Sequence, residues 1–243
     1  MADETKLKTS TSFCLIDILS HRYFKRLKDI KQLGILEHSS KETFTSYSRL
    51  DHSRGCESAM RTICFRLMEL TKDLDDNDPR KVTYYHCSIL RLAALVHDLG
   101  HGALSHGLDS YLTFHGFVGC EHEYRGVRLL NFMLEDTWNR NWRRSFPQGR
   151  QALMQQIGSL ITGNNVPLGI PVCMHTLVNS PTLDTVDVDR LDYIPRDVRL
   201  LMPKIFLDIA KLCQESIKTQ FILDQEKTRI VFPERANLIL MRL

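Results

Sequence analysis

The segment from residue 81 to 98 most constrains how this chain can fold. Its apolar residues recur at the spacing of one helical face, and two further leucines make that face unusually wide. The positions that share the face are Ile89, Leu92, Ala93 and Val96. A stripe of this width predicts a central helix that is buried on most sides.

This apolar helix ends in the adjacent polar residues His97 and Asp98. Neighbouring residues on a helix point about 100° apart, so they rarely share a target, but at a helix end both can converge on an ion. An imidazole and a carboxylate form a mixed nitrogen and oxygen site, which suits Mn, Fe, Zn or Mg. Because burying this pair without partners is costly, the sequence favours a metal site here.

Two ligands are too few, so further ligands must come from elsewhere in the chain. His52, within SRLDHSRG, and Asp189, within DVDRLDYIPRD, are candidates. Taken alone, each has a simpler interpretation. A histidine before a helix is more often a surface residue, and an acidic helix is usually a solvated face. On residue type and spacing alone, both assignments therefore stay open.

Most of the remaining periodic segments also indicate helices. Their expected ranges are 21–33, 56–72, 123–135, 150–162, 186–200 and 203–221. The clearest strand signal is RIVF at 229–232, which we expect to pair with 221–223 in a small C-terminal β-hairpin. The sequence thus predicts an all-α bundle in a single domain over 1–243, with residues 1–14 flexible.

Composition narrows the class of protein. The seven cysteines are scattered, odd in number and without a C-x-x-C pair, which predicts free thiols in a reducing, intracellular compartment, cytoplasmic or nuclear. There is no run of about 20 apolar residues, so no membrane partner is expected. A net charge of +3 does not indicate nucleic-acid binding, although it does not exclude it.

Five blocks of sequence resemble the HD-domain phosphohydrolases, and among them the deoxynucleoside triphosphate triphosphohydrolases. The blocks are RLKDIKQLG (26–34), SRLDHSRG (48–55), LVHDLGHGALSHGLD (95–109), HEYRGVRLL (122–130) and DVDRLDYIPRD (187–197). They occur in the order found in the family. The combination of HDLGHG with DVDRLDY is the most specific part of the resemblance.

The resemblance implies a role for individual residues and an HD-domain helical bundle as the fold. It implies the metal ligands His52, His97, Asp98 and Asp189, and the catalytic residues His101, Asp109 and His122. It implies phosphate contacts from Arg49, His106 and Arg190, and a deoxyribose pocket formed by Gln32, Leu33, Tyr193 and Asp197. The implied cofactor is a divalent metal, Fe, Mn or Zn, with Mg accompanying the triphosphate. The implied reaction converts a dNTP substrate into a deoxynucleoside and inorganic triphosphate.

Two departures from the family keep alternatives open. Arg190 stands where the family usually has lysine, and the chain ends at Leu243 in an apolar run, so we expect an incomplete C-terminal lobe. The alternatives are another HD-type nucleotide phosphohydrolase or phosphodiesterase, and a catalytically impaired, metal-binding regulatory relative. The implied sugar pocket argues against the first, and the three catalytic residues argue against the second. A homo-oligomer is compatible with either.

Overall fold

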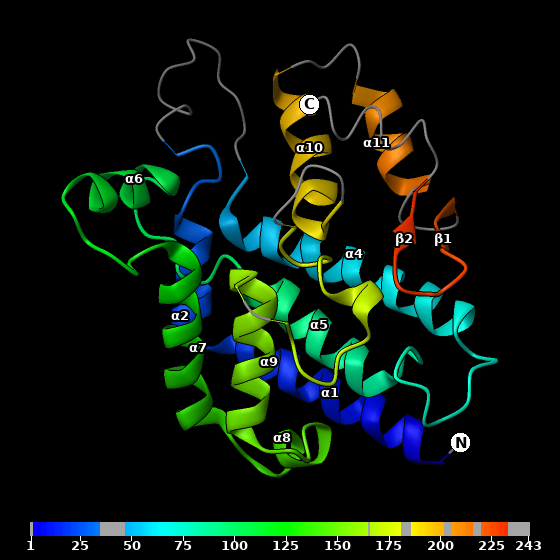
Figure 1. The fold of residues 1–243 in the computed structure, drawn as a ribbon. Coiled ribbons are helices and arrows are strands. Elements are labelled where there is room, and N and C mark those ends of the chain that lie inside the picture. Colours follow the sequence, from blue (N-terminus) through cyan, green and yellow to red (C-terminus); the bar gives the residue numbers. More distant parts are fainter. Residues whose placement is uncertain are drawn as a thin grey trace.

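The computed structural model describes residues 2–34, 47–164, 166–180, 186–201, 206–215 and 220–232, and helices dominate them (Figure 1). The longer helices are α1 (Ala2–Ser20), α4 (Arg49–Leu70), α5 (Tyr84–Val96), α6 (His106–Phe114), α7 (His122–Thr137), α9 (Arg150–Thr162), α10 (Val188–Leu201) and α11 (Phe206–Glu215). The shorter elements are α2 (Arg22–Lys25), η1 (Arg26–Asp29), α8 (Arg140–Ser145), η2 (Val172–Met174), β1 (Ile222–Leu223) and β2 (Ile230–Val231). The predicted all-α class is confirmed.

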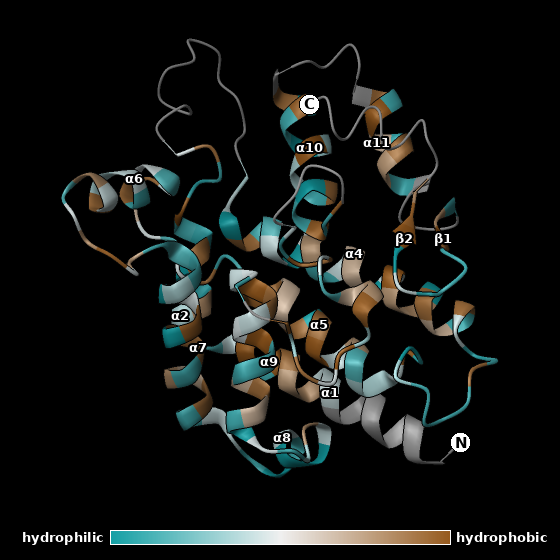
Figure 2. Cartoon of the chain, viewed as in Figure 1, coloured by the Kyte–Doolittle hydropathy of each residue, from teal (hydrophilic) through white to brown (hydrophobic). Residues whose placement is uncertain are grey.

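Helix α5 is the central helix that the apolar stripe predicts. From Cys87 to Val96 every residue except Arg91 is buried, and α4, α9 and α1 pack around it (Figure 1). The helix begins at a capping box, in which Thr83 accepts from the backbone of His86 and the His86 ring accepts from the backbone of Thr83. Figure 2 shows the apolar residues concentrated where these helices face one another.

Helix α4 begins seven residues earlier than the apolar pattern indicates. Ser48 caps it, because its hydroxyl accepts from the Asp51 backbone at 3.2 Å while the Asp51 carboxylate accepts from the Ser48 backbone at 3.1 Å. His52 therefore lies in the first turn of a helix and not in the loop before it. Because α4 begins at Arg49, the His52 side chain faces α10, which packs against α4.

The remaining expectations are met in part. The range 21–33 is divided between α2 and η1, and it ends early because the backbone becomes extended at Ile30. Helix α11 lies inside the expected range 203–221, while residues 203–205 and 216–219, Pro203 among them, lie outside the described residues. The hairpin is confirmed, with Ile222 opposite Val231 and Leu223 opposite Ile230.

The N-terminal segment contains a helix that was not predicted. Helix α1 spans Ala2–Ser20, and Thr11 and Cys14 are buried in it, while the flexibility expected of residues 1–14 stays a prediction. Further along this helix, the Asp17 carboxylate accepts a 2.9 Å hydrogen bond from the Trp142 indole of α8. Cys14, Leu15 and Ile18 are buried, but Phe13 and Ile16 are exposed and the first turns carry mostly polar residues, so the sequence shows no clear helical stripe. Helices α6 and α8 were also not predicted.

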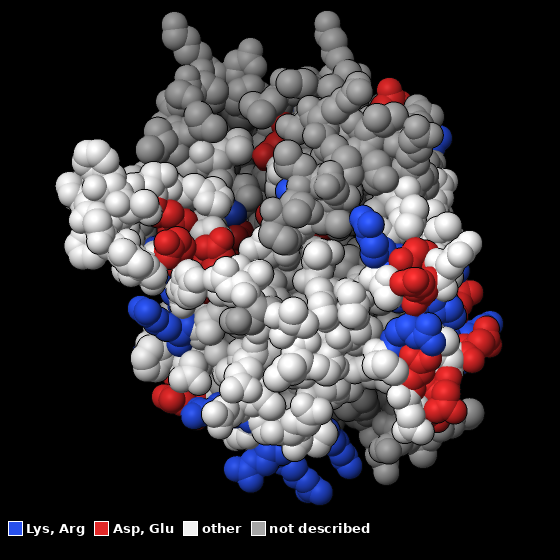
Figure 3. Space-filling model, viewed as in Figure 1, with Lys and Arg blue, Asp and Glu red and all other residues white. Residues whose placement is uncertain are grey.

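Charged side chains of each sign gather in separate parts of the surface. Figure 3 shows acidic side chains gathered beside α6 and the upper end of α7, and basic ones over α8.

Within the described ranges, none of the helices combines the length and apolar character needed to cross a membrane. All seven cysteines are free, as predicted.

Candidate metal centre and adjoining histidine cluster

The structure brings together the four residues predicted as metal ligands, from α4, the end of α5 and the start of α10. His52 Nε2 lies 2.9 Å from Asp189 Oδ1 and 3.5 Å from Asp98 Oδ2. His97 Nε2 lies 3.7 Å from Asp189 Oδ1 and 3.5 Å from Asp98 Oδ1. His52 is completely buried, and His97 and Asp98 are nearly so. Two imidazoles and two carboxylates thus converge on one point inside the bundle.

The His97 ring has the form that a metal ligand requires. Its Nδ1 donates to the Ala94 carbonyl at 2.9 Å, which leaves the lone pair on Nε2. Nε2 is buried and has no hydrogen-bond partner within the described part of the chain. A buried polar atom without a partner is costly, so this nitrogen fits a cation held between His97 and the carboxylates.

His52 is oriented by residues that the sequence interpretation missed. Its Nδ1 donates to Asp192 Oδ2 at 2.8 Å, and Arg196 Nε holds the same carboxylate oxygen at 2.8 Å. Carboxylates of this kind fix the ring and tautomer of metal-binding histidines. Gly55 makes the approach possible, because a Cβ there would lie 1.8 Å from Asp192 Oδ1. Asp192 follows Asp189 by three residues on α10, which is the signal that could have identified it.

Arg49, for which we predict a phosphate contact, is paired with a carboxylate in this structure. Its guanidinium lies 2.6 Å from Asp98 Oδ2, with both side chains buried, and its Nε donates to Ser105 Oγ at 3.1 Å. Burial alone would raise the pKa of Asp98, but its contacts with His97, Arg49 and His101 hold it well below its usual range. Both carboxylates of the centre are therefore ionised, since the two histidines likewise hold the pKa of Asp189 below its usual range despite burial.

A second cluster adjoins this centre and contains His101, His106, Asp109 and His122. The rings of His101 and His122 are stacked with centroids 3.9 Å apart, and His106 meets both edge-on at 4.7 and 5.1 Å. His101 is fully buried, whereas the His106 side chain is 67% exposed. His101 Nε2 lies 3.2 Å from Asp98 Oδ1, so the two clusters are in contact.

Asp109 and His122 form a hydrogen-bonded pair within the second cluster. His122 Nδ1 donates to Asp109 Oδ2 at 2.7 Å, and Arg125 donates to Asp109 Oδ1 at 2.6 Å. Burial and the neighbouring His101 lower the pKa of His122 to about 4. At neutral pH the His122 ring is therefore neutral, with its proton on Nδ1 and its lone pair on Nε2.

The loop between the clusters is held by backbone contacts. Arg26 donates to the carbonyl oxygens of Leu99 and His101, and Arg125 donates to that of Gly100 at 3.0 Å. A Cβ on Gly100 would lie 1.8 Å from the His122 carbonyl oxygen. Only glycine allows α7 to begin so close to this loop. Sequence reasoning identified neither arginine, because guanidinium bonds to carbonyl oxygens leave no periodic pattern.

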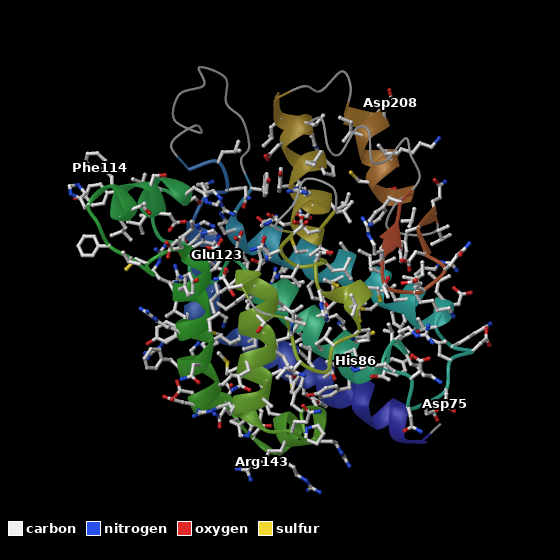
Figure 4. All side chains as sticks on the ribbon, viewed as in Figure 1. Asp75, His86, Phe114, Glu123, Arg143 and Asp208 are labelled. Carbon is white, nitrogen blue, oxygen red and sulfur yellow. The ribbon has the colours of Figure 1, made fainter. Side chains whose placement is uncertain are left out.

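Both clusters open into a cavity of about 570 Å³. The predicted site residues that line it are Gln32, Leu33, Arg49, His97, Asp98, His106, His122, Asp189, Tyr193 and Asp197. His52, His101, Asp109 and Arg190 are not part of that lining. Glu123, labelled at the start of α7 in Figure 4, also lines the cavity and adds to its acidic character.

One part of the cavity wall involves a residue that was not predicted. Asp197 Oδ1 accepts a 2.7 Å hydrogen bond from the Tyr47 hydroxyl, and the Arg196 guanidinium lies 5.1 Å from the centre of the Tyr47 ring. Gln32 Oε1 is buried without a hydrogen-bond partner among the described residues. A carboxylate and an unsatisfied amide oxygen therefore both lie at this cavity as hydrogen-bond acceptors.

No family model matches the chain, but several curated proteins are similar to it. Over 203 residues, 83% of this chain, it is 27% identical to a Dictyostelium discoideum protein named deoxynucleoside triphosphate triphosphohydrolase SAMHD1 homolog. Over 225 residues, 90% of this chain, it is 24% identical to the putative HD domain-containing protein L394 of Acanthamoeba polyphaga mimivirus. Over 186 residues, 74% of this chain, it is 30% identical to the uncharacterized protein YwfO of Bacillus subtilis (strain 168).

These similarities cover most of this chain but a smaller part of each relative. The chain spans 36%, 45% and 35% of the lengths of the three proteins. Together with the all-α bundle and the buried histidine and aspartate cluster, they support an HD-domain protein.

Proposed function

We propose that this chain is a metal-dependent phosphohydrolase that converts dNTPs into deoxynucleosides and inorganic triphosphate. The convergence of His52, His97, Asp98 and Asp189, with His97 Nε2 buried and without a hydrogen-bond partner among the described residues, carries the proposal. The HD-domain relatives support a metal-dependent hydrolase in general. The Dictyostelium relative's name supports the dNTP substrate.

The four converging residues would hold a divalent transition metal. When bound, such an ion lowers the pKa of water and offsets phosphate charge. The ionised carboxylates of Asp98 and Asp189 supply the negative charge that the ion needs. Asp192 holds the His52 ring and the Ala94 carbonyl holds the His97 ring, so both nitrogens are directed before the ion arrives.

The second cluster would handle the proton of the leaving 5′-oxygen. Asp109 fixes the proton of His122 on Nδ1, so Nε2 is the atom that exchanges protons with substrate. A bound triphosphate would favour the protonated ring, because its negative charge raises the pKa of a nearby imidazole. His106, at the exposed end, would face the phosphates with it, while the buried His101 would support the His122 ring by stacking on it.

The cavity wall would select the sugar. The 3′-hydroxyl can donate one hydrogen bond, which either Gln32 Oε1 or Asp197 would accept, while Leu33 and Tyr193 would leave no space for a 2′-hydroxyl. All four residues line the same cavity, which supports this assignment. Arg190 lies on α10 but does not line the cavity, so it would contact the phosphates from outside the lining.

A second candidate is a related HD-type hydrolase whose substrate has fewer phosphates. The paired Arg49 favours it, because an arginine held at 2.6 Å by Asp98 is less available to a triphosphate. A lining that includes Asp98, Glu123, Asp189 and Asp197 also favours a less charged ligand.

Product analysis distinguishes the two candidates. The chain, loaded with Mn²⁺, Fe²⁺ or Zn²⁺, is incubated with each dNTP, the matching ribonucleotide and a deoxynucleoside monophosphate. We expect deoxynucleoside and inorganic triphosphate from dNTPs only. Release of single phosphate or pyrophosphate, or equal turnover of ribonucleotides, would contradict the dNTP assignment and favour the second candidate. The variant Asp208→Asn serves as the control for substitutions of the site carboxylates. Asp208 is an exposed carboxylate on α11 and does not line the cavity (Figure 4).

A further inference from the structure

Arg196 on α10 contacts residues beside both the metal centre and the cavity wall. Its Nε and Nη2 donate to the two carboxylate oxygens of Asp192, at 2.8 and 3.1 Å. Its Nη2 also donates to the Asp51 carbonyl at 3.2 Å, and its guanidinium lies 5.1 Å from the centre of the Tyr47 ring. One side chain therefore links α10 to the first turn of α4 and to the residues just before it.

On one side, Arg196 holds the carboxylate that orients the predicted metal ligand His52. Asp192 Oδ2 accepts from His52 Nδ1 at 2.8 Å as well as from Arg196. A two-point contact from a planar guanidinium fixes the plane of the carboxylate as well as its position. The contact is close to α4, because a Cβ on Gly55 would lie 2.8 Å from Arg196 Nη2. A change in the His52 ring is therefore passed on to the guanidinium.

On the other side, the guanidinium faces a tyrosine that binds the cavity wall. A cation within about 6 Å of the centre of an aromatic ring is attracted by the face of that ring. The Tyr47 hydroxyl donates to Asp197 Oδ1 at 2.7 Å, and Asp197 lines the cavity. An unbroken series of contacts thus runs through His52, Asp192, Arg196, Tyr47 and Asp197.

We propose that Arg196 is a positioning residue that couples metal binding at His52 to recognition of the sugar 3′-hydroxyl by Asp197. The inference rests on the proposed function and adds one residue to it. A metal ion on Nε2 fixes the His52 ring, which in turn fixes Asp192, the guanidinium and the Tyr47 ring. The Asp197 carboxylate is then ordered before the sugar arrives, so less conformational entropy is lost when the sugar binds.

Nucleosides without phosphates separate this coupling from direct contact between the metal and a triphosphate. A 2′-deoxynucleoside carries the 3′-hydroxyl, and the matching 2′,3′-dideoxynucleoside differs only in lacking it. The ratio of their dissociation constants, measured by calorimetry for each base, therefore reports the 3′-hydroxyl alone. We expect Mn²⁺ to raise this ratio about 5-fold or more in the wild-type chain. By thermodynamic reciprocity, the deoxynucleoside should tighten Mn²⁺ binding by the same factor relative to the dideoxynucleoside.

Three variants locate the coupling. In Arg196→Ala the ratio should no longer depend on Mn²⁺. Tyr47→Phe keeps the aromatic ring but loses the hydroxyl, so it should lose the Mn²⁺ dependence while keeping wild-type Mn²⁺ affinity without nucleoside. Arg196→Lys keeps the charge but not the two-point contact with Asp192, so its ratio should rise less than in the wild type. Arg66→Ala is the matched control, because Arg66 pairs with Glu69 at 2.9 Å on α4 and does not line the cavity.

The outcomes separate this inference from the function on which it rests. If Mn²⁺ raises the ratio equally in the wild type and in Arg196→Ala, the coupling passes along α10 and the inference is wrong. If Mn²⁺ binds but leaves the wild-type ratio unchanged, the two sites are not coupled, while the metal centre and the hydrolysis stand. If Mn²⁺ does not bind, or the wild type does not distinguish the two nucleosides, the proposed function fails with the inference. Circular dichroism confirms the fold of each variant, and Arg196→Lys decides by the same ratio if Arg196→Ala does not fold.

Discussion

The rings of His97 and His122 belong to adjoining clusters, yet they are held in opposite ways. A neutral backbone carbonyl, that of Ala94, holds Nδ1 of His97, whereas the charged carboxylate of Asp109 holds Nδ1 of His122. A carbonyl orients a ring without adding charge, which suits a nitrogen that shares its lone pair with a cation. A carboxylate also stabilises the ring when it gains a proton. The same residue type is therefore prepared for ion binding in one cluster and for proton exchange in the other.

The largest effect is expected where the two clusters meet. Asp98→Asn removes the charge that contacts His52, His97 and Arg49, and it leaves Arg49 buried without its partner. We expect metal content and hydrolysis both to fall to background, measured by elemental analysis and product formation. Asp208→Asn should change neither. If Asp98→Asn keeps full metal content, Asp98 does not belong to the ion-binding cluster.

A substitution confined to the second cluster should impair proton exchange without impairing metal binding. His122→Gln removes the ring that exchanges the proton but leaves the four predicted ligands in place. We expect turnover to fall about 10²- to 10⁴-fold, as for loss of a general acid or base, while metal content stays at the wild-type level. Loss of the metal together with activity would show that the clusters do not act separately.

The contact between the clusters can be tested with a single methyl group. In Gly100→Ala the new Cβ would lie 1.8 Å from the His122 carbonyl oxygen, so α7 must shift. We expect the free energy of unfolding to fall by about 1–3 kcal/mol, measured by denaturant titration, with reduced turnover. Gly158→Ala on α9 is the matched control, because its nearest contact is an ordinary 3.8 Å from Val127. Equal stability of the two variants would contradict the close approach.

The smallest effect is expected at the cavity wall. Tyr47→Phe removes only the hydroxyl that donates to Asp197 at 2.7 Å. One hydrogen bond is worth about 1 kcal/mol, so we expect about a 5-fold loss of turnover for dNTPs and less for 2′,3′-dideoxynucleotides. Steady-state kinetics with both substrate types provides the measurement. An equal loss with both would mean that Tyr47 does not act through the 3′-hydroxyl.

The sequence predicts the parts of this site that rest on periodicity and motif. The wide apolar face of α5 predicts a buried central helix, and the His-Asp pair at its end predicts a metal site. The ordered sequence blocks identify His52 and Asp189 as candidate ligands of that metal. The structure brings these residues together, while the roles of the individual site residues stay predictions. The small hairpin was also foreseen, because its strands flank a polar turn.

Other parts have no signal in a single sequence. Arg26 and Arg125 hold carbonyl oxygens, which every residue carries, so their bonds cannot be inferred from residue type. The break after Asp29 depends on the pairing of Lys31 with Ser48, which is a long-range contact. Arg49 illustrates the same limit, because its residue type suits a phosphate and a buried carboxylate equally well.

The close approach of Gly100 to His122 has a consequence for protein engineering. Because the backbone of α7 approaches Gly100 so closely, a side chain at residue 100 would change the geometry between the two clusters. Transplanting the HDLGHG segment into another helical scaffold would thus carry over only His97, Asp98 and His101, without His122 or the ligands from α4 and α10. A working graft would need the first turn of α7 as a second inserted segment, fixed at the same separation by its own glycine contact.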